Sequence, residues 1–326
     1  MRFLFGGRAH FVALLAVAVA AMAALPAAAR PPGTNGQITF ARFNPTLGDT
    51  QVYVVNPDGS GQRLVQAPTD TGECPTWFPD GAHIATCGAP DRPGGGSRII
   101  NPDDGTFREI DGQYPGLFNP CTNPSPDGTL LLCETFSEDG SQNGIHTIRT
   151  SDGGGLTPIT SVPGGDDIPG DWSPNGKRIV FLRTTVDALF VINTNGTGLK
   201  QITPAGLDFS SFGSWSPQGN EIVFSQHVTP DVHSSIWVVH TDGSGLREIN
   251  VQPASACGGA NADPTAKGCN QPTWSPDGTK IAFIRSFHNI LDGEVYTVNV
   301  DGTGLTQVTH APGVDGVDWG THPPTG

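Results

Sequence analysis

A short phrase recurs along this chain and limits its fold more than any other feature. The phrase is an aromatic residue, a tight turn of the Ser-Pro-Asp-Gly type and an apolar strand, and it stands at 77–81, 172–176, 215–219 and 274–278. Pro124 begins a copy that lacks the tryptophan, and Trp319 ends a copy that lacks the turn. Neighbouring anchors are 43 to 59 residues apart. A period of roughly 40–50 residues in a strand-rich chain is typical of β-propeller blades.

Each copy of the repeat divides into four short strands. An inner strand ends at the anchor, and the turn that follows has proline second and glycine fourth, as tight turns prefer. A second, apolar strand such as 281–283 comes next, followed by an alternating strand with an aromatic residue such as 295–298. An Asp-Gly or Asn-Gly dipeptide such as 301–302 then predicts a hairpin into a brief fourth strand.

The phase of the repeat predicts how the ring closes. The first strand, 36–40, is a second strand without an inner strand before it, and the last, 317–319, is an unaccompanied inner strand. Pairing the two completes one blade and protects sheet edges that would otherwise be open. We therefore predict an all-β fold, a six-bladed β-propeller over residues 36–322 that is closed by pairing its N-terminal and C-terminal strands, with a tail at 323–326.

Five of the six tryptophans stand at the anchor position, which favours packing between neighbouring blades. An aromatic platform for a sugar ligand is the alternative interpretation.

Residues 1–29 are predicted to be a signal peptide. Arg2 and Arg8 precede an apolar stretch at 11–25, and three alanines at 27–29 offer a cleavage site. An uncleaved membrane anchor is the alternative, because the apolar stretch is nearly long enough to span a bilayer. Cleavage would leave a short linker at 30–35, no integral membrane segment in the mature chain, and a secreted or periplasmic protein.

The chain is acidic, with 17 basic and 31 acidic residues and a formal net charge of −14. Loss of residues 1–29 would remove two basic residues and give −16. This balance argues against nucleic acid as a partner, because nucleic acid needs a basic surface. It is compatible with a protein or peptide partner that is cationic or associated with the cell envelope, and we expect a monomer.

Six cysteines behind an export signal predict disulfides, and they form the close pairs Cys74/Cys87, Cys121/Cys133 and Cys257/Cys269. A hairpin loop centred on Asp127 places the second pair face to face, because each cysteine lies six residues from the centre. In the first pair, Cys74 lies six residues before Asp80 and Cys87 lies seven after it. This pair therefore requires a one-residue bulge. A metal site is disfavoured, because the pairs lack Cys-x-x-Cys spacing.

The repeat text resembles that of the TolB-like propellers, also described as the PD40 branch of WD40-like repeats. The match is clearest at 274–305, where Trp-Ser-Pro-Asp-Gly and Ile-Ala-Phe precede Tyr-x-Val-Asn-x-Asp-Gly-x-Gly-Leu, and it extends over 36–319. The resemblance implies a propeller but several functions, since such relatives include TolB of the Tol–Pal system, propeller domains of prolyl-oligopeptidase-type peptidases and oligogalacturonate lyases. We expect this chain to lack the N-terminal domain of TolB. It has no Gly-x-Ser-x-Gly motif, and its histidines are scattered.

Both tight turns of each blade should lie on one face of the ring, which leaves connections of variable length on the other. We expect a ligand-binding site on this variable-loop face, above all at the 250–270 insertion. Two groups of residues recur near this face. Three arginines each stand two residues after a strand phenylalanine, and acidic residues stand on the loops and inner strands before the anchors. The candidates are Arg42, Arg183, Arg285, Asp70, Asp166, Asp167, Asp208 and Asp315. Two interpretations stay open: structural pairing of arginines with carboxylates, or an acidic mouth for a basic ligand, peptide or cation.

A weaker metal-binding hypothesis rests on loop histidines of the last two blades, namely His227, His233 and His288. No spacing requires a metal there, and the Asp-Gly turns lack the glycine and glutamate of an EF-hand loop. We therefore expect no cofactor and a non-catalytic binding or scaffold module for a protein, peptide or cell-envelope ligand. The alternative is a propeller-fold lyase or hydrolase with a metal or carboxylate site in the central funnel.

Overall fold

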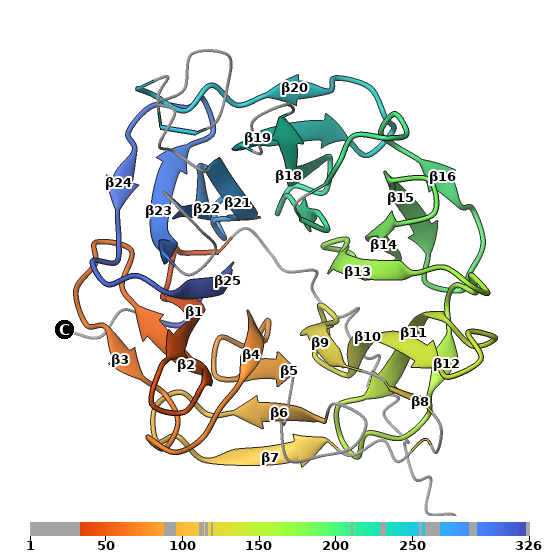
Figure 1. Ribbon diagram of the computed structural model, residues 1–326, viewed down its shortest axis with the longest axis horizontal. Coiled ribbons are helices and arrows are strands. Elements are labelled where there is room, and N and C mark those ends of the chain that lie inside the picture. Colours follow the sequence, from red (N-terminus) through yellow and green to blue (C-terminus); the bar gives the residue numbers. More distant parts are fainter. Residues whose placement is uncertain are drawn as a thin grey trace, which may run out of the picture.

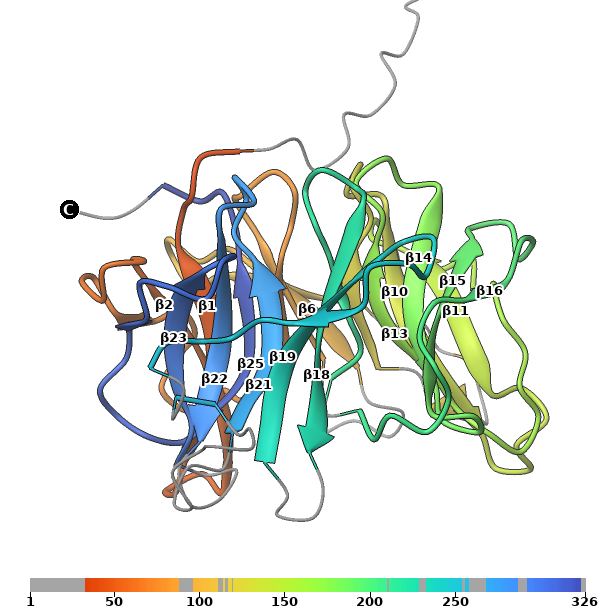
Figure 2. The same cartoon turned by 90° about the horizontal axis from the view of Figure 1, so that it is seen from above.

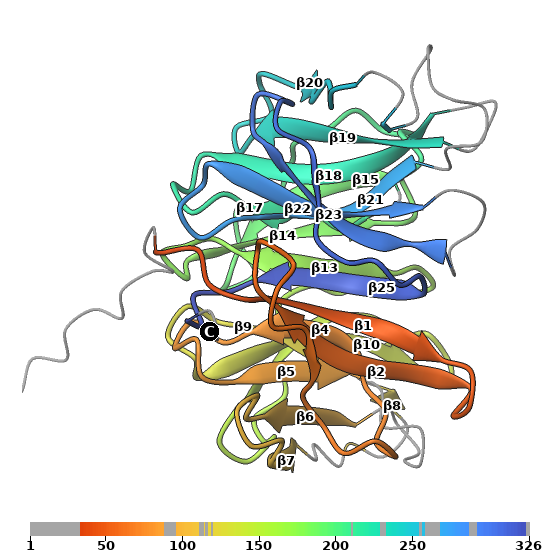
Figure 3. The same cartoon turned by 90° about the vertical axis from the view of Figure 1, so that its left-hand side faces the viewer.

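The computed structural model is an all-β ring in which antiparallel sheets stand around a central axis (Figure 1). It describes residues 33–87, 96–110, 114, 117–118, 120–209, 211–228, 233–253, 256–257, 268–286 and 292–323. The strands run roughly along the axis in side view (Figures 2 and 3). Within these residues, no helix is long and apolar enough to cross a membrane. The expected all-β propeller arrangement is confirmed.

The first and last strands of the described chain pair with each other and close the ring. Strand β1 (Ile38–Asn44) runs antiparallel to β25 (Val314–Trp319), and Ile38 lies opposite Trp319. Backbone bonds from Gly36 N to Gly320 O and from Gln37 N to His322 O extend the contact beyond the paired strands. The predicted pairing of the N-terminal and C-terminal strands is therefore confirmed.

Three of the sheets have four strands each, ordered from the channel outward. The closing sheet, β25-β1-β2-β3, adds β2 (Asp49–Val55) and β3 (Arg63–Leu64). The next contains β4 (Glu73–Trp77), β5 (Ile84–Cys87), β6 (Ser97–Ile100) and β7 (Phe107–Ile110). The third contains β13 (Asp167–Trp172), β14 (Arg178–Arg183), β15 (Ala188–Asn193) and β16 (Lys200–Gln201).

Two sheets are larger. The five-stranded sheet contains β8 (Leu117–Phe118), β9 (Cys121–Pro124), β10 (Leu130–Ser137), β11 (Gly144–Arg149) and β12 (Thr157–Pro158). The eight-stranded sheet joins one antiparallel set of β17 (Ser214–Trp215), β18 (Glu221–Val228), β19 (His233–His240) and β20 (Arg247–Glu248) to a second. The second set is β21 (Gly268–Trp274), β22 (Lys280–Ser286), β23 (Glu294–Asn299) and β24 (Thr306–Gln307).

The described strands form five hydrogen-bonded sheets, whereas one sheet for each of six predicted blades would give six. The difference comes from one parallel pair, Ser234 with Gly268, which joins β19 to β21. A Cβ on Gly268 would lie 2.2 Å from the backbone nitrogen of Ser234. The two sheet edges can meet there because this residue has no side chain. The sheets thus form a propeller-like ring, and the count of six blades stays a prediction.

The Pro-Asp-Gly turns have the geometry that the sequence predicts. In the turn at 125–128, the Asp127 carboxylate accepts bonds from Ser125 Oγ at 2.6 Å and from Thr129 N at 3.0 Å, while Gly128 has a φ of 70°. A glycine adopts this left-handed conformation without the clash that a Cβ would cause. Each such turn therefore reverses the chain on the face opposite the variable loops.

The hydrophobic cores lie between neighbouring sheets. Trp77 packs with Val52 and Val54 of the preceding sheet, and Trp215 packs with Val180. All five anchor tryptophans are at most 6% exposed. This burial confirms that they pack between sheets and excludes an exposed aromatic platform at these positions. Each such ring contributes on the order of 3 kcal/mol through apolar burial.

Three disulfides form in the predicted pairs, Cys74–Cys87, Cys121–Cys133 and Cys257–Cys269. The second pair is in direct cross-strand register. The first lies at a register shift between Glu73 and Thr76, which is the expected bulge. Disulfides persist in oxidising surroundings, so three of them indicate such a compartment.

Trp319 tests how much ring closure stabilises the protein. Its side chain is 2% exposed, and its Nε1 donates to Gly36 O at 2.9 Å. We expect Trp319→Ala to lower the free energy of unfolding by about 3–5 kcal/mol, because it removes a buried ring at the closure. Trp237→Ala, at a half-buried position away from the closure, is the control and should cost less. Urea unfolding followed by circular dichroism measures both, and equal costs would contradict this role of Trp319.

Candidate functional site

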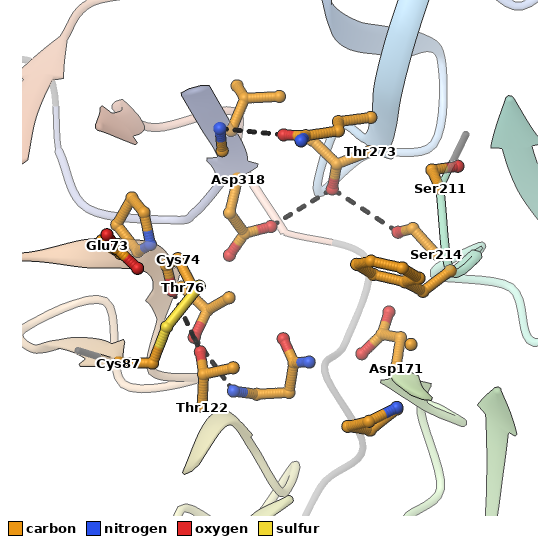
Figure 4. Close-up of a pocket in the computed structure, with 18 of the residues that line it drawn as sticks. Glu73, Cys74, Thr76, Cys87, Thr122, Asp171, Ser211, Ser214, Thr273 and Asp318 are labelled. Carbon is orange, nitrogen blue, oxygen red and sulfur yellow. Dashed lines mark hydrogen bonds between the residues drawn. A yellow bond between two sulfur atoms is a disulfide. The ribbon is translucent and has the colours of Figure 1, made fainter. Parts of the chain in front are cut away.

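The central channel widens into a pocket of about 460 Å³ (Figure 4). Every inner strand contributes to its wall, and the residue directly before each anchor lines it: Thr76, Asn123, Asp171, Ser214, Thr273 and Asp318. The five anchor tryptophans and the prolines of four turns line a second space of about 40 Å³. Because the anchors lead into the turns, the wide pocket opens toward the variable-loop face.

Irregular pairing turns these polar residues toward the channel. The register with the adjacent strand shifts in β4, β9, β13, β21 and β25. Left-handed backbone accompanies the shifts at Cys74 (φ 49°), Asn123 (φ 50°), Gln271 (φ 49°) and Gly316 (φ 64°). A β-bulge re-aims side chains and is common beside binding sites. The bulged inner strands therefore set which side chains reach the pocket.

Two aspartates of the pocket wall bond to neighbouring sheets. Asp318 Oδ2 accepts a bond from Trp77 N at 2.8 Å, and its Oδ1 accepts one from Thr273 Oγ1 at 3.2 Å. Asp171 Oδ2 accepts a bond from Trp215 N at 2.9 Å. Figure 4 shows Thr273 between Asp318 and Ser214, with bonds to both. Charge-assisted bonds of this kind are strong, so both carboxylates are fixed in place.

The pocket wall is negatively charged. Five carboxylates line it, and the described wall contains no lysine, arginine or histidine; the carboxylates are Glu73, Glu134, Asp171, Asp315 and Asp318. Phe118 and Phe212 also line the pocket, and they are 47% and 43% exposed. A concave site with charges of one sign concentrates its field, so this pocket attracts cations.

Glu134 is the pocket carboxyl whose protonation is most altered. Burial, and secondly the charge of Asp166, raise its pKa to about 7. Burial also raises the pKa of Glu73, and the charges of Asp49 and Asp315 add to that effect. Strongly shifted carboxyl groups in a cleft are characteristic of functional sites.

The three candidate arginines do not line the pocket. Each places its guanidinium over aromatic rings of its own sheet: Arg42 over Phe40 and Tyr53, Arg183 over Phe181 and Phe190, and Arg285 over Tyr296. Arg183 also forms a bidentate ion pair with the buried Asp167, with both bonds at 2.7 Å. Arg285 Nε donates to Ala256 O at 2.7 Å. These contacts agree with the structural interpretation of the arginines.

The acidic candidates occupy different places. Asp315 lines the pocket, where its Oδ1 accepts a bond from Gln271 Nε2 at 3.0 Å. Asp166 acts on Glu134 through its charge but is not part of the wall. Asp70 and Asp208 lie on loops away from the wall. Of the eight candidate ligand-binding residues, Asp315 is thus the one that the structure brings into the pocket.

The histidine hypothesis stays a prediction, because His288 and the side chain of His233 lie outside the described residues. Most of the 250–270 insertion lies outside them as well. In the part of the chain that the structure describes, the one cluster with metal-ligand spacing is Glu73, Cys74 and Cys87. Its two sulfurs are bonded to each other and are not thiolates, which are the form that binds metals.

The candidate list omitted much of the pocket wall, including Thr76, Ser214, Thr273 and Glu134. A signal exists for the first three, because the residue before each anchor is polar in every copy of the repeat. Strand alternation gives no such signal for Glu134, because Leu132 on the same face of β10 is fully buried between sheets.

No family profile and no curated protein matches the sequence, but solved structures match the fold. TolB from Acinetobacter baumannii has a TM-score of 0.68 at 17% identity, over 87% of this chain and 66% of that chain, so this chain spans just under two thirds of it. A putative TolB from Agrobacterium tumefaciens has a TM-score of 0.63 at 21% identity, over 87% of this chain and 92% of that chain. A chain of a nidogen/laminin complex has a TM-score of 0.63 at 8% identity, over 88% of this chain and 99% of that chain. These similarities support a TolB-like propeller and establish the fold alone.

Glu134 should make stability depend on pH. Its pKa is raised in the folded state, so the stability linked to the protonated carboxyl is complete below the ordinary value of 4.5 and is lost as the pH rises through about 7. We expect Glu134→Gln to raise the free energy of unfolding by on the order of 1–3 kcal/mol at pH 8 and by nearly nothing at pH 4. Urea unfolding at both values measures this, with the exposed Glu138→Gln as control. A gain that is the same at both values would refute the assignment.

Arg42 tests the interpretation that these arginines pair with carboxylates of a neighbouring strand. The residue opposite Arg42 differs from the residue opposite Arg183. Arg183 faces Asp167, whereas Arg42 faces Val314, and Nε and Nη2 of Arg42 have no hydrogen-bond partner in the described chain. We expect Val314→Asp to form the missing bidentate pair and Val314→Asn not to do so. At neutral pH the aspartate variant should be more stable than the asparagine variant by about 1–3 kcal/mol in urea unfolding. Equal stability of the two variants would contradict structural pairing of these arginines with carboxylates.

Proposed function

We propose that this protein is an exported, non-catalytic binding module whose central pocket holds a basic group of a protein or peptide partner. The observation that carries the proposal is the pocket wall, in which five carboxylates and no described basic side chain occur. Such a wall attracts cations and repels anions. Nucleic acid is accordingly not expected as a ligand.

The size and apolar surface of the pocket favour a short peptide segment with a lysine or arginine. Its volume of about 460 Å³ falls within the range of about 300–1,000 Å³ that is common for small-ligand sites. Phe118 and Phe212 expose aromatic surface in the same wall. Aromatic rings pack against the apolar stem of a lysine or arginine and attract its charge.

We also propose that the ring has six blades and forms one domain. The two halves of the eight-stranded sheet, β17–β20 and β21–β24, count as separate blades if each anchor starts one, since a single parallel pair joins them. Residues 36–322 are then one propeller domain, 30–35 a linker and 323–326 a tail.

Export is proposed from the signal-like residues 1–29 and is supported by the three disulfides. The proposed location is secreted or periplasmic, with a partner in the cell envelope or beyond it. We propose a monomer that works without a cofactor.

A lyase or hydrolase with a carboxylate site in the same pocket is the second candidate. Glu134 favours it, because a carboxyl with a pKa of about 7 can give and take a proton near neutral pH. Binding is preferred because the hydroxyls of the described wall already have hydrogen-bond partners, as Thr76 has in Thr122 at 2.8 Å and Thr50 has in Gly72 O at 2.9 Å. Turnover of a substrate that is lost in Glu134→Gln would favour the enzyme.

Charge-dependent peptide binding tests the proposal. We expect a fluorescein-labelled tetralysine peptide to bind at low salt, and the same peptide with acetylated lysines to bind at least about tenfold more weakly. The double variant Glu73→Gln/Asp315→Asn should lose most of the affinity because it removes two charges of the wall. Asp242→Asn, at an exposed turn outside the pocket, is the matched control. Fluorescence anisotropy measures all of these, and equal binding of the acetylated peptide would rule the proposal out.

A further inference from the structure

The five carboxylates of the pocket differ in their hydrogen bonds. Asp171 and Asp318 accept bonds from backbone N–H groups of neighbouring sheets, and Asp315 accepts one from Gln271. The carboxyl groups of Glu73 and Glu134 have no hydrogen-bond donor among the described residues. Oxygens that already accept bonds from the protein have less capacity for a ligand. Glu73 and Glu134 are therefore the pocket carboxylates that are most available to a cation.

Strand β10 carries Glu134 on the face that packs against the β13 sheet. Leu132, two residues earlier on that face, is fully buried with Trp172, and Glu134 continues the same face into the pocket wall. The backbone N–H of Glu134 donates to Pro120 O at 3.1 Å, which ties this part of β10 to the segment before β9. The side chain is half-buried in the pocket wall, whereas Glu73 is exposed.

The charges around Glu134 leave its carboxylate without a compensating cation. Asp166 is the charged group that acts on it most strongly. Strand β13 brings Asp171 and also Asp167, whose charge Arg183 already matches. Strand β11 brings His146, and burial lowers the pKa of that imidazole, which keeps it neutral near pH 7. Strands β8 and β9 add no titratable group apart from the bonded Cys121. Partial burial beside like charges disfavours the ionised carboxyl.

We propose that Glu134 is the residue of the pocket wall that makes capture of a basic ligand depend on pH, a role that rests on the proposed function. The protonated carboxyl adds no negative charge and is a poor partner for an ammonium or guanidinium group. The ionised carboxylate accepts charge-assisted hydrogen bonds from the same group. Binding at low pH therefore releases the Glu134 proton to solvent as the ligand cation takes its place. Capture is weak at pH 6 and strong at pH 8.

The test uses the fluorescein-labelled tetralysine peptide in anisotropy titrations from pH 5.5 to 8.5 at constant ionic strength. The wild-type protein should gain about tenfold in affinity over this range, with a midpoint close to 7. Glu134→Gln should bind with the low-pH affinity throughout and should show no gain. Glu138→Gln, one residue beyond β10 and exposed, should keep the wild-type profile. Glu73→Gln should bind more weakly at every pH but keep the midpoint.

A carboxyl NMR titration of the free protein supplies a second readout. The Glu134 side-chain resonance, assigned by its loss in Glu134→Gln, should titrate with a midpoint near 7. A wild-type pH profile that persists in Glu134→Gln, or a Glu134 midpoint near the ordinary 4.5, overturns this inference and leaves the proposed function standing. Failure of the tetralysine peptide to bind better than its acetylated form at any pH overturns both.

Discussion

The pairing of β25 with β1 is the interaction on which the rest of the structure depends. It sets Trp319 opposite Ile38 and closes the ring, so that the first and last strands of the described chain share one sheet. Closure holds each inner strand at a fixed place around one axis, and the pocket wall is assembled from all of them. An open array of the same sheets would have the same local turns and no pocket. The binding site is thus a property of the closed ring and of no single repeat.

Within the channel, acidic side chains serve two different purposes. Asp171 and Asp318 accept backbone bonds across sheet boundaries and so belong to the framework. Glu73 and Glu134 line the same wall without a donor among the described residues, and burial raises the pKa of both. The carboxylate of Glu134 is half-buried, and such a group without a partner destabilises the fold when it is charged. Such groups are typical of functional sites, where a ligand or a proton supplies the positive charge that the protein itself does not provide.

The fold was predictable because its signals are local, and the limits of that prediction are specific. Counting from Asp127 placed Cys121 opposite Cys133, but the hairpin itself pairs Leu131 with Pro124, and a register shift next to that pair brings the cysteines face to face. The junction of β19 with β21 was not predictable, because a glycine contact between distant segments creates it. The arginines were placed on the correct strands, but Arg183 lies over Phe181 on the same face of β14 rather than in the pocket. Their spacing of two residues already implied a shared face.

The sequence by itself determined the strands, the turns, the disulfide pairs and the closing partners. These features depend on side-chain alternation and backbone preference among neighbours in the chain. Only the tertiary structure decided which polar side chains reach the channel, because bulges at residues such as Cys74 and Gln271 change the alternation. It also decided the protonation of Glu134, through burial and the charge of Asp166. Desolvation and Coulomb energies follow distances in space, and a linear sequence does not contain those distances.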